Sequence, residues 1–503
     1  MIFVSLSVIL ETALLVHLAF NISDSISWVN LITRIVAVVL VLGIYSQYKT
    51  SSLKMPWIIL ILVLPVMGVT LFLLVGLTVR TGKMYNRFRE TDAEILPMLE
   101  GKKKPETDDR SVDNLSFYIS TRSGFPAYAD ANVRYFSDTN EALSAQIEAM
   151  KAAKKFIFLE YHAIEDSVAW QRVEEVLAEK VAQGVEVRVF YDDLGSLVFI
   201  NNTDFIKKMK SLGIHARVFN PFIIGANLFL NNRDHRKITI VDGNIGFTGG
   251  YNLADEYFNI THPYGLWKDT GIQIYGEPVR NMTAMFLEMW NAIRSTDEDD
   301  ADYTGYLDAA SVPPAEEKGE RVSIVQPYAD TPLDNEQVGE EVYISMVNLA
   351  ERYCYFVTPY LIISDEMSHA LSLAAKRGVD VRIVTPGIPD KKFVYGVTRS
   401  FYHHLARNGV GIYEWTPGFV HAKMCVTDDK AATVGTINLD YRSLYHHFEN
   451  GCFLYGGELI TGIRKDFEQM IAESQYVTPK YTSGRKFYLR FGQLLMRLFA
   501  QLL

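Results

Sequence analysis

The sequence predicts an α/β protein in which two related halves follow a set of N-terminal transmembrane helices. Three observations predict this class. Apolar runs open the chain, strand-like and helix-like segments alternate from about residue 115, and one polar pattern occurs twice. With 503 residues, of which 49% are hydrophobic, the chain is long enough for several domains and a large core.

Three apolar runs, at about 2–21, 29–47 and 56–78, predict the transmembrane helices. The third run contains no charged residue and is long enough to cross a bilayer. The second carries one charge, Arg34, near its start, where a long side chain can reach the headgroups. Because the first run contains an acidic residue and a histidine, we expect either two or three spans.

Basic residues indicate how the chain is oriented. Arg80, Lys83, Arg87, Arg89 and Lys102 to Lys104 all follow the last apolar run. Positive charge near the end of a span favours the cytoplasmic side of a membrane. We therefore expect a multi-pass protein of the cell membrane with its long C-terminal region in the cytoplasm.

Strands and helices follow the same order in two stretches of the chain. A buried strand is expected at 154–164, a helix at 170–184 and a second strand at 185–193. The corresponding segments of the second stretch are 352–362, 363–378 and 379–387. This is the pattern of β-α-β units, which favours an α/β fold.

The pattern His-x-Lys-x4-Asp occurs at 235–242, as HRKITIVD, and at 421–428, as HAKMCVTD. The two copies are 186 positions apart, and Asn252 and Asn438 keep the same separation. Four polar positions with one offset indicate an internal duplication. We expect the two halves to pack with pseudo-twofold symmetry, so that both copies meet at one centre.

The expected organisation has five parts, with an acidic, proline-containing segment between the halves. They are a membrane anchor at 1–80, a juxtamembrane linker at 81–114, a first half at 115–295, an acidic linker at 296–320 and a second half at 321–503. The C-terminal segment, residues 487–503, is apolar with spaced arginines. It predicts an amphipathic helix on the membrane surface or a helix docked on the core.

The spacing of the motif indicates phosphate chemistry. Residues i and i+2 of a strand share a side, so His235 and Lys237 are expected together, as are His421 and Lys423. A lysine neutralises phosphate oxygens beside an imidazole that reacts. One histidine would attack phosphorus and form a phosphohistidine, while the other would protonate the departing alkoxide. The sequence is symmetric and assigns neither role.

Five further residues complete the expected site. Asn252 and Asn438 follow glycine-containing turns and are expected, with Thr436, to bind the substrate phosphate. Asp269 and Glu449 precede matching strands and are expected to orient the histidines. Because the lysines and asparagines can stabilise the negative charge of the phosphate, we expect neither a metal nor a cofactor.

The other candidate positions have competing interpretations. Asp242 and Asp428 complete the motif as candidate catalytic residues, but both end a strand beside turn residues, which favours a turn or packing role. His162 and Tyr360 end matching strands and are expected at the edge of the pocket. The apolar stretch 219–232 predicts either pocket lining or an ordinary strand and loop.

Composition excludes several classes of protein. The net charge of −10 provides no general basic field, which argues against a nucleic-acid partner. Cys354, Cys425 and Cys452 are isolated, so neither a disulfide framework nor a thiolate metal site is expected.

The motifs resemble the phospholipase D superfamily, because each HxKxxxxD is followed by a glycine turn and asparagine, GGYN or GTIN. The segments MPWIILILVLPVMGVTLFLLVG and LDYRSLYHHFENG make nearly the whole chain similar to bacterial cardiolipin synthases of the Gram-positive type. The family implies that two phosphatidylglycerol molecules give cardiolipin and glycerol at a lipid bilayer. It also implies that His235 is the nucleophile and His421 the acid and base. The oligomeric state stays open.

One departure from the superfamily pattern is GTIN, where many members have Gly-Ser-x-Asn. Thr436 keeps the hydroxyl there, whereas the first copy has Gly250 and no hydroxyl.

Other interpretations of the sequence remain open. They are a membrane-bound phospholipase D hydrolase or another phosphatidyltransferase, a nuclease of the same superfamily, and a non-enzymatic membrane scaffold.

Overall fold

The computed structural model describes most of the chain. The described residues are 27–47, 50–73, 82–99, 105–196, 202–221, 232–293, 300, 302–311, 318–334, 336–482, 492, 496–497 and 500.

The strands divide between the two halves of the chain. Those of the first half are β1 Tyr128–Phe136, β2 Phe156–Tyr161, β3 Glu186–Asp192, β4 His215–Phe219, β5 Arg233–Asp234, β6 Lys237–Val241, β7 Ile245–Gly249, β8 Leu266–Lys268 and β9 Gly271–Tyr275. Those of the second are β10 Glu320–Asp330, β11 Tyr353–Val357, β12 Asp380–Pro386, β13 Gly411–Trp415, β14 Gly418–Val420, β15 Met424–Thr427, β16 Ala431–Gly435, β17 His447–Tyr455 and β18 Ser474–Tyr476.

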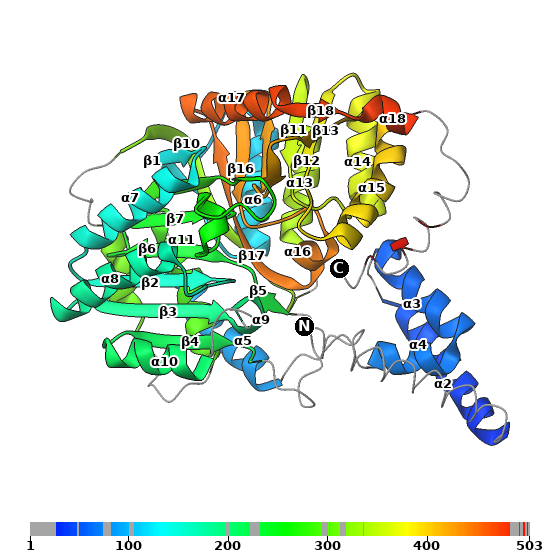
Figure 1. Cartoon of the computed structure of the whole chain (residues 1–503), viewed down its shortest axis with the longest axis horizontal. Helices are drawn as coiled ribbons and strands as arrows, with labels where there is room; N and C mark the ends of the chain where they lie inside the picture. The colour runs from blue at the N-terminus through cyan, green and yellow to red at the C-terminus, as the bar shows by residue number, and fades with distance from the viewer. Residues whose placement is uncertain are drawn as a thin grey trace.

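Most of the helices pack around these strands, whereas α2, α3 and α4 lie to one side of them (Figure 1). The first are α2 Ser27–Tyr45, α3 Ser51–Val63, α4 Pro65–Leu71, α5 Gly82–Leu99 and α6 Arg110–Arg122. The first half adds α7 Thr139–Ala152, α8 Val168–Ala182, α9 Asp193–Ser196, α10 Asn202–Ser211, the 3₁₀ turn η2 Asp255–Phe258 and α11 Val279–Ala292. The remainder are α12 Thr304–Asp308, the 3₁₀ turn η3 Ala309–Ser311, α13 Val338–Leu349, α14 Asp365–Lys376, α15 Lys392–Arg407, α16 Tyr441–Tyr445, α17 Glu458–Ala472 and α18 Thr478–Thr482.

One large sheet joins the two halves. Its order is β18-β13-β12-β11-β15-β16-β17-β10-β1-β9-β7-β6-β2-β3-β4, and β5 pairs with β17 beside this path. At the junction β1 and β10 pair antiparallel, with Tyr128 opposite Val325. Outward from this junction, equivalent strands of the two halves follow in the same order. This arrangement fits the expected pseudo-twofold relation.

Alternating side chains give the sheet two covered faces, as is usual for an α/β protein. In β2, Ile157 and Leu159 belong to the core cluster that contains residues of α7 and α8. Phe158 points the other way, into the cluster that contains α11, and it stacks on Phe286. Every residue of α11 is buried, which places this helix in the centre of the molecule.

Local capping explains where matching helices begin and end. Ser167 and Ser364 each accept a hydrogen bond from the backbone N–H three residues further on, which starts α8 and α14. After the same helices Gly184 and Gly378 have φ of 86° and 95°. Glycine tolerates this left-handed conformation, so both helices end where the sequence predicts.

The prediction of N-terminal transmembrane helices is wrong. Among the residues that the structure describes, none of the helices combines the length and the apolar character that crossing a membrane requires. The third expected span is divided into α3, of 13 residues, and α4, of seven. Leu64 between them has φ −129° and ψ 73°, since a residue before proline is disfavoured in a helix. The 19-residue α2 begins with polar turns that contain Asn30 and Arg34.

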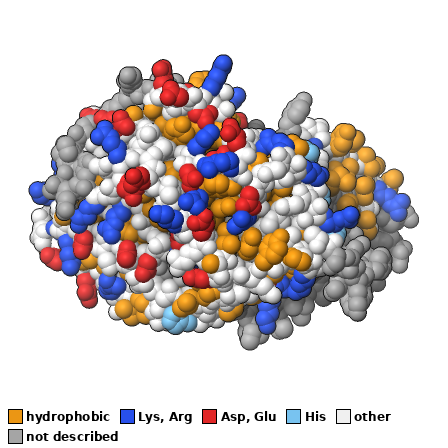
Figure 2. Space-filling model, turned by 90° about the horizontal axis from the view of Figure 1, so that it is seen from above, with side chains coloured by type: hydrophobic (Ala, Val, Ile, Leu, Met, Phe, Trp, Pro, Cys, Tyr) orange, Lys and Arg blue, Asp and Glu red, His pale blue; other side chains and the backbone are white. Residues whose placement is uncertain are grey.

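These helices form a small apolar unit of their own. Buried side chains of α2, α3 and α4 pack together around Ile61. Other apolar side chains of α2 and α3, such as Val39, Leu42 and Val63, are more than 60% exposed. Figure 2 shows hydrophobic side chains gathered at the end of the molecule where these helices lie.

Several expectations concern residues outside the described part. These are the first apolar run at 2–21, most of the stretch 219–232 and most of the C-terminal segment. The domain boundaries stay a prediction.

Candidate active site

Two short parallel ladders bring the halves together at the motif histidines. β5 pairs with β17, and the backbone N–H of His235 donates to the carbonyl of Phe448 at 2.9 Å. In the same way β14 pairs with β8, and the N–H of His421 donates to the carbonyl of Lys268 at 2.7 Å. The residue after each of these carbonyls is a carboxylate. Each histidine is thus placed beside an acidic residue of the opposite half.

The two carboxylates contact the histidines directly. Glu449 accepts from Nδ1 of His235, with Oε1 at 2.8 Å, and Asp269 accepts from Nδ1 of His421, with Oδ2 at 2.6 Å. All four side chains are buried. A carboxylate at Nδ1 selects the tautomer in which the lone pair of Nε2 is available to react. This geometry suits the orienting role expected for Asp269 and Glu449.

The lysines of the motif point back to their own histidines. Lys237 Nζ donates to the carbonyl oxygen of His235 at 2.7 Å. Lys423 Nζ lies 2.9 Å from Nε2 of His421 and also donates to the carbonyl of that residue. The ammonium group of Lys423 therefore lies beside the reacting nitrogen of His421, where it can contact a bound anion, whereas that of Lys237 contacts the backbone of His235.

Burial sets the ionisation of these groups. It lowers the pKa of Lys237 to about 7 and that of Lys423 to about 8. Burial and the charge of Lys423 lower the pKa of His421 to about 3, and burial with Lys237 holds the pKa of His235 well below its usual value. Burial alone would raise the pKa of Asp269, but Lys423 and His421 lower it. Without a ligand, both imidazoles are therefore neutral at pH 7.

The two asparagines line the cavity, whereas Thr436 does not. Asn252 accepts from the backbone N–H of Ala163 and donates to the Tyr257 hydroxyl at 2.8 Å. Asn438 is buried at the cavity wall. The Thr436 hydroxyl donates to Glu449, behind the reacting groups. The expectation that Thr436 binds the substrate phosphate is therefore not supported by its position.

Asp242 and Asp428 lie at the other ends of their strands. The carboxylate of Asp242 accepts from three successive backbone N–H groups, at residues 154 to 156, over 2.7–3.0 Å. That of Asp428 does the same at residues 351 to 353. Both residues have positive φ, 51° and 54°. The structure places them as turn and strand-start residues, away from the histidines that they accompany in the motif.

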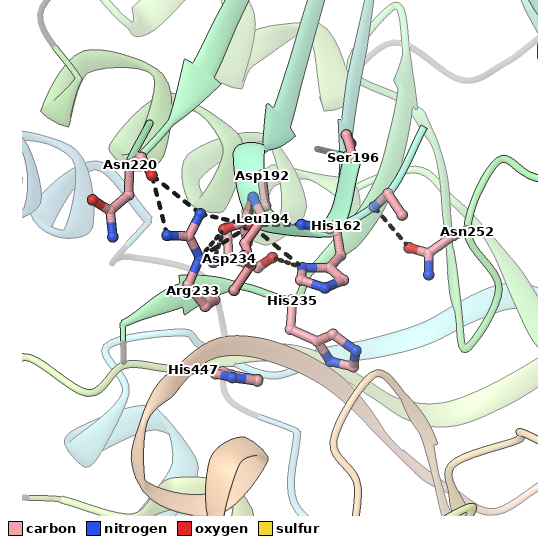
Figure 3. A network of polar contacts seen from close by, with 12 residues as sticks. His162, Asp192, Leu194, Ser196, Asn220, Arg233, Asp234, His235, Asn252 and His447 are labelled. Carbon is pink, nitrogen blue, oxygen red and sulfur yellow. Dashed lines mark hydrogen bonds and ion pairs between the residues drawn. The ribbon is translucent and has the colours of Figure 1, made fainter. Parts of the chain in front are cut away.

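A cavity of about 580 Å³ opens over the two histidines and is lined by both halves. Its two sides differ. Beside His421 the wall is aromatic, since the rings of Trp267, Tyr257 and Phe419 lie 5.2–5.8 Å from its ring. Beside His235 the neighbours are histidines. The ring of His162 lies 4.9 Å away and that of His447 5.5 Å away (Figure 3). As expected, His162 and Tyr360 both line the cavity.

Sequence analysis missed several residues of this site. Arg233 forms an ion pair with Asp192 at 2.8 Å (Figure 3). This contact fixes β5, the short strand directly before His235. His447 and Trp267 each precede an orienting carboxylate by two positions, and this shared spacing is the signal that would have found them. Among the described residues, the group His235, His447 and Glu449 is suited to hold a metal ion.

Comparisons with known proteins agree with this architecture. The family described as "Cardiolipin synthase, PLD-like domain" matches residues 146–290 and 343–471, one segment in each half. A phosphatidylserine synthase of Haemophilus influenzae shares the fold, with a TM-score of 0.57 and 15% identity over 79% of this chain and all of that one. The fold and the paired motifs thus define a phospholipase D-like protein with two motif-bearing halves.

Curated relatives narrow the family. An uncharacterized protein of Streptococcus mutans is 40% identical over 91% of this chain and 98% of its own length. The cardiolipin synthase of Oceanobacillus iheyensis is 31% identical over 92% and 95%, and that of Halalkalibacterium halodurans is 30% identical over 93% and 92%. The chain belongs to the cardiolipin synthase family.

Proposed function

We propose that the protein is a cardiolipin synthase, a phosphatidyltransferase that converts two phosphatidylglycerol molecules into cardiolipin and glycerol. One observation carries the proposal. In a chain of this family, the two motif histidines come from different halves and line one cavity, each beside its own lysine. Each histidine is held by a carboxylate of the other half. Such a site binds one phosphodiester and presents an imidazole on either side of it.

The reaction proceeds in two displacements. Nε2 of His235 attacks phosphorus, and the bond from phosphorus to the oxygen of the headgroup glycerol breaks. His421 gives that oxygen a proton. A phosphatidyl group is then bound to His235. His421 removes the proton from a hydroxyl of the second phosphatidylglycerol, whose oxygen attacks phosphorus and releases His235. The choice of His235 as nucleophile follows the resemblance to the family.

The lysines stabilise the charge that develops on the phosphoryl oxygens in both steps. Lys423 lies against His421 and lowers its pKa, whereas a bound phosphodiester offsets this positive charge and favours the protonated imidazole that the first step needs. The aromatic wall beside His421 suits a lipid hydroxyl better than water. The acceptor is therefore proposed to enter along this wall.

Both substrates reside in a bilayer, and we place the protein at the cytoplasmic face of the cell membrane. The exposed apolar side chains of α2 and α3, such as Val39 and Leu42, offer a contact with lipid. Holding the cavity near the bilayer raises the effective concentration of donor and acceptor. Flotation with phosphatidylglycerol vesicles tests this contact. Val39→Asp with Leu42→Asp is expected to reduce the bound fraction, and unchanged flotation would contradict it.

The decisive assay supplies phosphatidylglycerol as the sole phospholipid and follows lipids by mass spectrometry. The wild type is expected to form cardiolipin and glycerol, and His235→Ala and His421→Ala are expected to form neither. His369→Ala, which changes an exposed histidine of α14, is the matched control. Phosphatidic acid as the main product would instead show a hydrolase. No turnover of any phospholipid would refute the substrate.

A further inference from the structure

His447 is a buried polar side chain at the reaction centre that the mechanism above does not use. Its side chain is 10% exposed, and neither ring nitrogen has a hydrogen-bond partner among the residues that the structure describes. A buried polar group without a partner is unfavourable, so it indicates a ligand. The nearest carboxylate oxygen, Oε1 of Glu449, lies 3.7 Å from Nδ1 of His447.

The same oxygen of Glu449 lies 2.8 Å from Nδ1 of His235. The ligand atoms of these three residues all lie within 4.8 Å of one another. Two imidazoles and a carboxylate form a donor set that Zn²⁺ accepts, at about 2.0–2.2 Å from each atom. Tetrahedral ligands at that radius are about 3.3 Å apart. The two separations that involve Glu449, 2.8 and 3.7 Å, bracket this value, and the two imidazole nitrogens lie within 4.8 Å of each other, so an ion fits once the side chains move closer to it.

The equivalent position at the other histidine cannot bind a metal. Trp267 precedes Asp269 by two residues, as His447 precedes Glu449, and its ring lies 5.2 Å from that of His421. Tryptophan offers a ring N–H but no lone pair for a cation. The donor set is therefore complete on the His235 side alone, and the duplication provides an internal comparison.

We propose that His235, His447 and Glu449 form a site for Zn²⁺ or a similar transition-metal ion, and that its occupation inhibits the transferase. The ion replaces the proton on Nδ1 of His235, and that proton passes to solvent. The bond that orients His235 is then lost, and its ring becomes a poorer nucleophile. Lys237 and Lys423 oppose the positive charge of the ion, while Glu449 and Asp269 favour it. The inhibition rests on the proposed function, whereas the metal site does not.

The first test measures binding alone. The full-length protein, stripped of metal, is titrated with Co²⁺ and followed by its visible absorption, and Zn²⁺ is then added in competition. We expect one site per chain with the spectrum of nitrogen and oxygen ligands. His447→Asn is expected to weaken binding at least about tenfold. His369→Asn, on the exposed face of α14, is the control and is expected to bind as the wild type does.

A gain of binding provides the converse test. Trp267→His places an imidazole beside Asp269 and His421, and the number of Co²⁺ sites is expected to rise from one to two. Equal affinity in the wild type and His447→Asn, or no site in the wild type, would overturn the proposal whether or not the protein makes cardiolipin.

The second test measures inhibition within each variant. Cardiolipin formation with Zn²⁺ is divided by formation in chelator, so a change in basal rate does not affect the ratio. We expect a tenfold lower ratio for the wild type than for His447→Asn. Binding that leaves the wild-type ratio unchanged would keep the metal site and overturn its inhibitory effect.

Discussion

Nδ1 of His235 donates to Glu449, although the two residues belong to different halves and are 214 positions apart in the chain. His421 and Asp269 make the reciprocal contact at 2.6 Å. Each half thus provides a histidine that it does not orient and a carboxylate that orients the histidine of its neighbour. The site exists only when both halves pack along β1 and β10.

Glu449→Gln tests this crossed arrangement. An amide lacks the charge that stabilises the imidazolium, and it no longer enforces one tautomer. We expect kcat to fall about 100-fold or more while KM changes little. Steady-state rates on phosphatidylglycerol vesicles measure both constants. Glu458→Gln, an exposed change at the start of α17, is the control, and a kcat of the variant within threefold of that control would contradict the prediction.

Gly250→Ala tests why the two turns differ in sequence. A Cβ at residue 250 would lie 2.0 Å from Oδ1 of Asp269, whose other oxygen holds His421. The second half accommodates Thr436 at the equivalent position, where its hydroxyl donates to Glu449. We expect the alanine to displace Asp269 and to lower kcat about tenfold or more. Gly462→Ala is the control, since nothing lies within 4 Å of its added Cβ. Equal kcat in the two variants would show that Asp269 need not be held in place.

Asp242→Asn separates a structural residue from the chemistry of its motif. Asparagine tolerates the positive φ of this position. It lacks the charge and one of the two acceptor oxygens with which the carboxylate binds three backbone N–H groups. We expect the free energy of unfolding to fall by about 1–3 kcal/mol, while kcat below the melting temperature stays within about twofold. Thermal unfolding and rates are compared with Asp108→Asn, an exposed acidic residue. A large loss of kcat at full stability would return Asp242 to the reaction.

The duplication made much of the fold and site predictable. The constant offset of 186 residues identified equivalent histidines, lysines and asparagines, and matching β-α-β segments placed them on matching strands. Which carboxylate serves which histidine was not predictable. The crossing depends on the ladders β5 with β17 and β14 with β8, and these pair segments that are distant in sequence.

Two other features escaped the sequence analysis for identifiable reasons. His447 and Trp267 are 180 positions apart, not 186, because the segment between motif and carboxylate is shorter in the second half. Hydropathy detects an apolar run but not a break in its backbone. The run at 56–78 therefore predicted a single span, whereas Leu64, ahead of Pro65, separates α3 from α4.

The pKa of Lys423, lowered by burial to about 8, predicts how pH affects the binding of an anionic substrate. A bound phosphodiester favours the charged ammonium and raises this pKa, so binding takes up a proton wherever the free lysine is neutral. Affinity is therefore constant below pH 7 as far as Lys423 is concerned, and it weakens as pH rises through 8. Between pH 7 and pH 9 Lys423 alone is expected to cause a loss of about tenfold, and Lys237, with a pKa of about 7, adds to it.

A phosphonate analogue of dihexanoyl phosphatidylglycerol, in which the leaving oxygen is replaced by carbon, is a suitable probe, because it is not turned over and its single negative charge does not titrate in this range. Calorimetry at pH 7 and pH 9, in two buffers of different ionisation enthalpy, measures both Kd and proton uptake. Lys423→Met is expected to bind more weakly but with less dependence on pH, because one of the two titrating lysines is gone. Lys465→Met, an exposed change on α17, is expected to keep the wild-type ratio of the two constants. If Kd at pH 9 equals Kd at pH 7 and no proton is taken up, Lys423 is already charged before the lipid arrives, and the neutral state assigned to it above pH 8 is wrong.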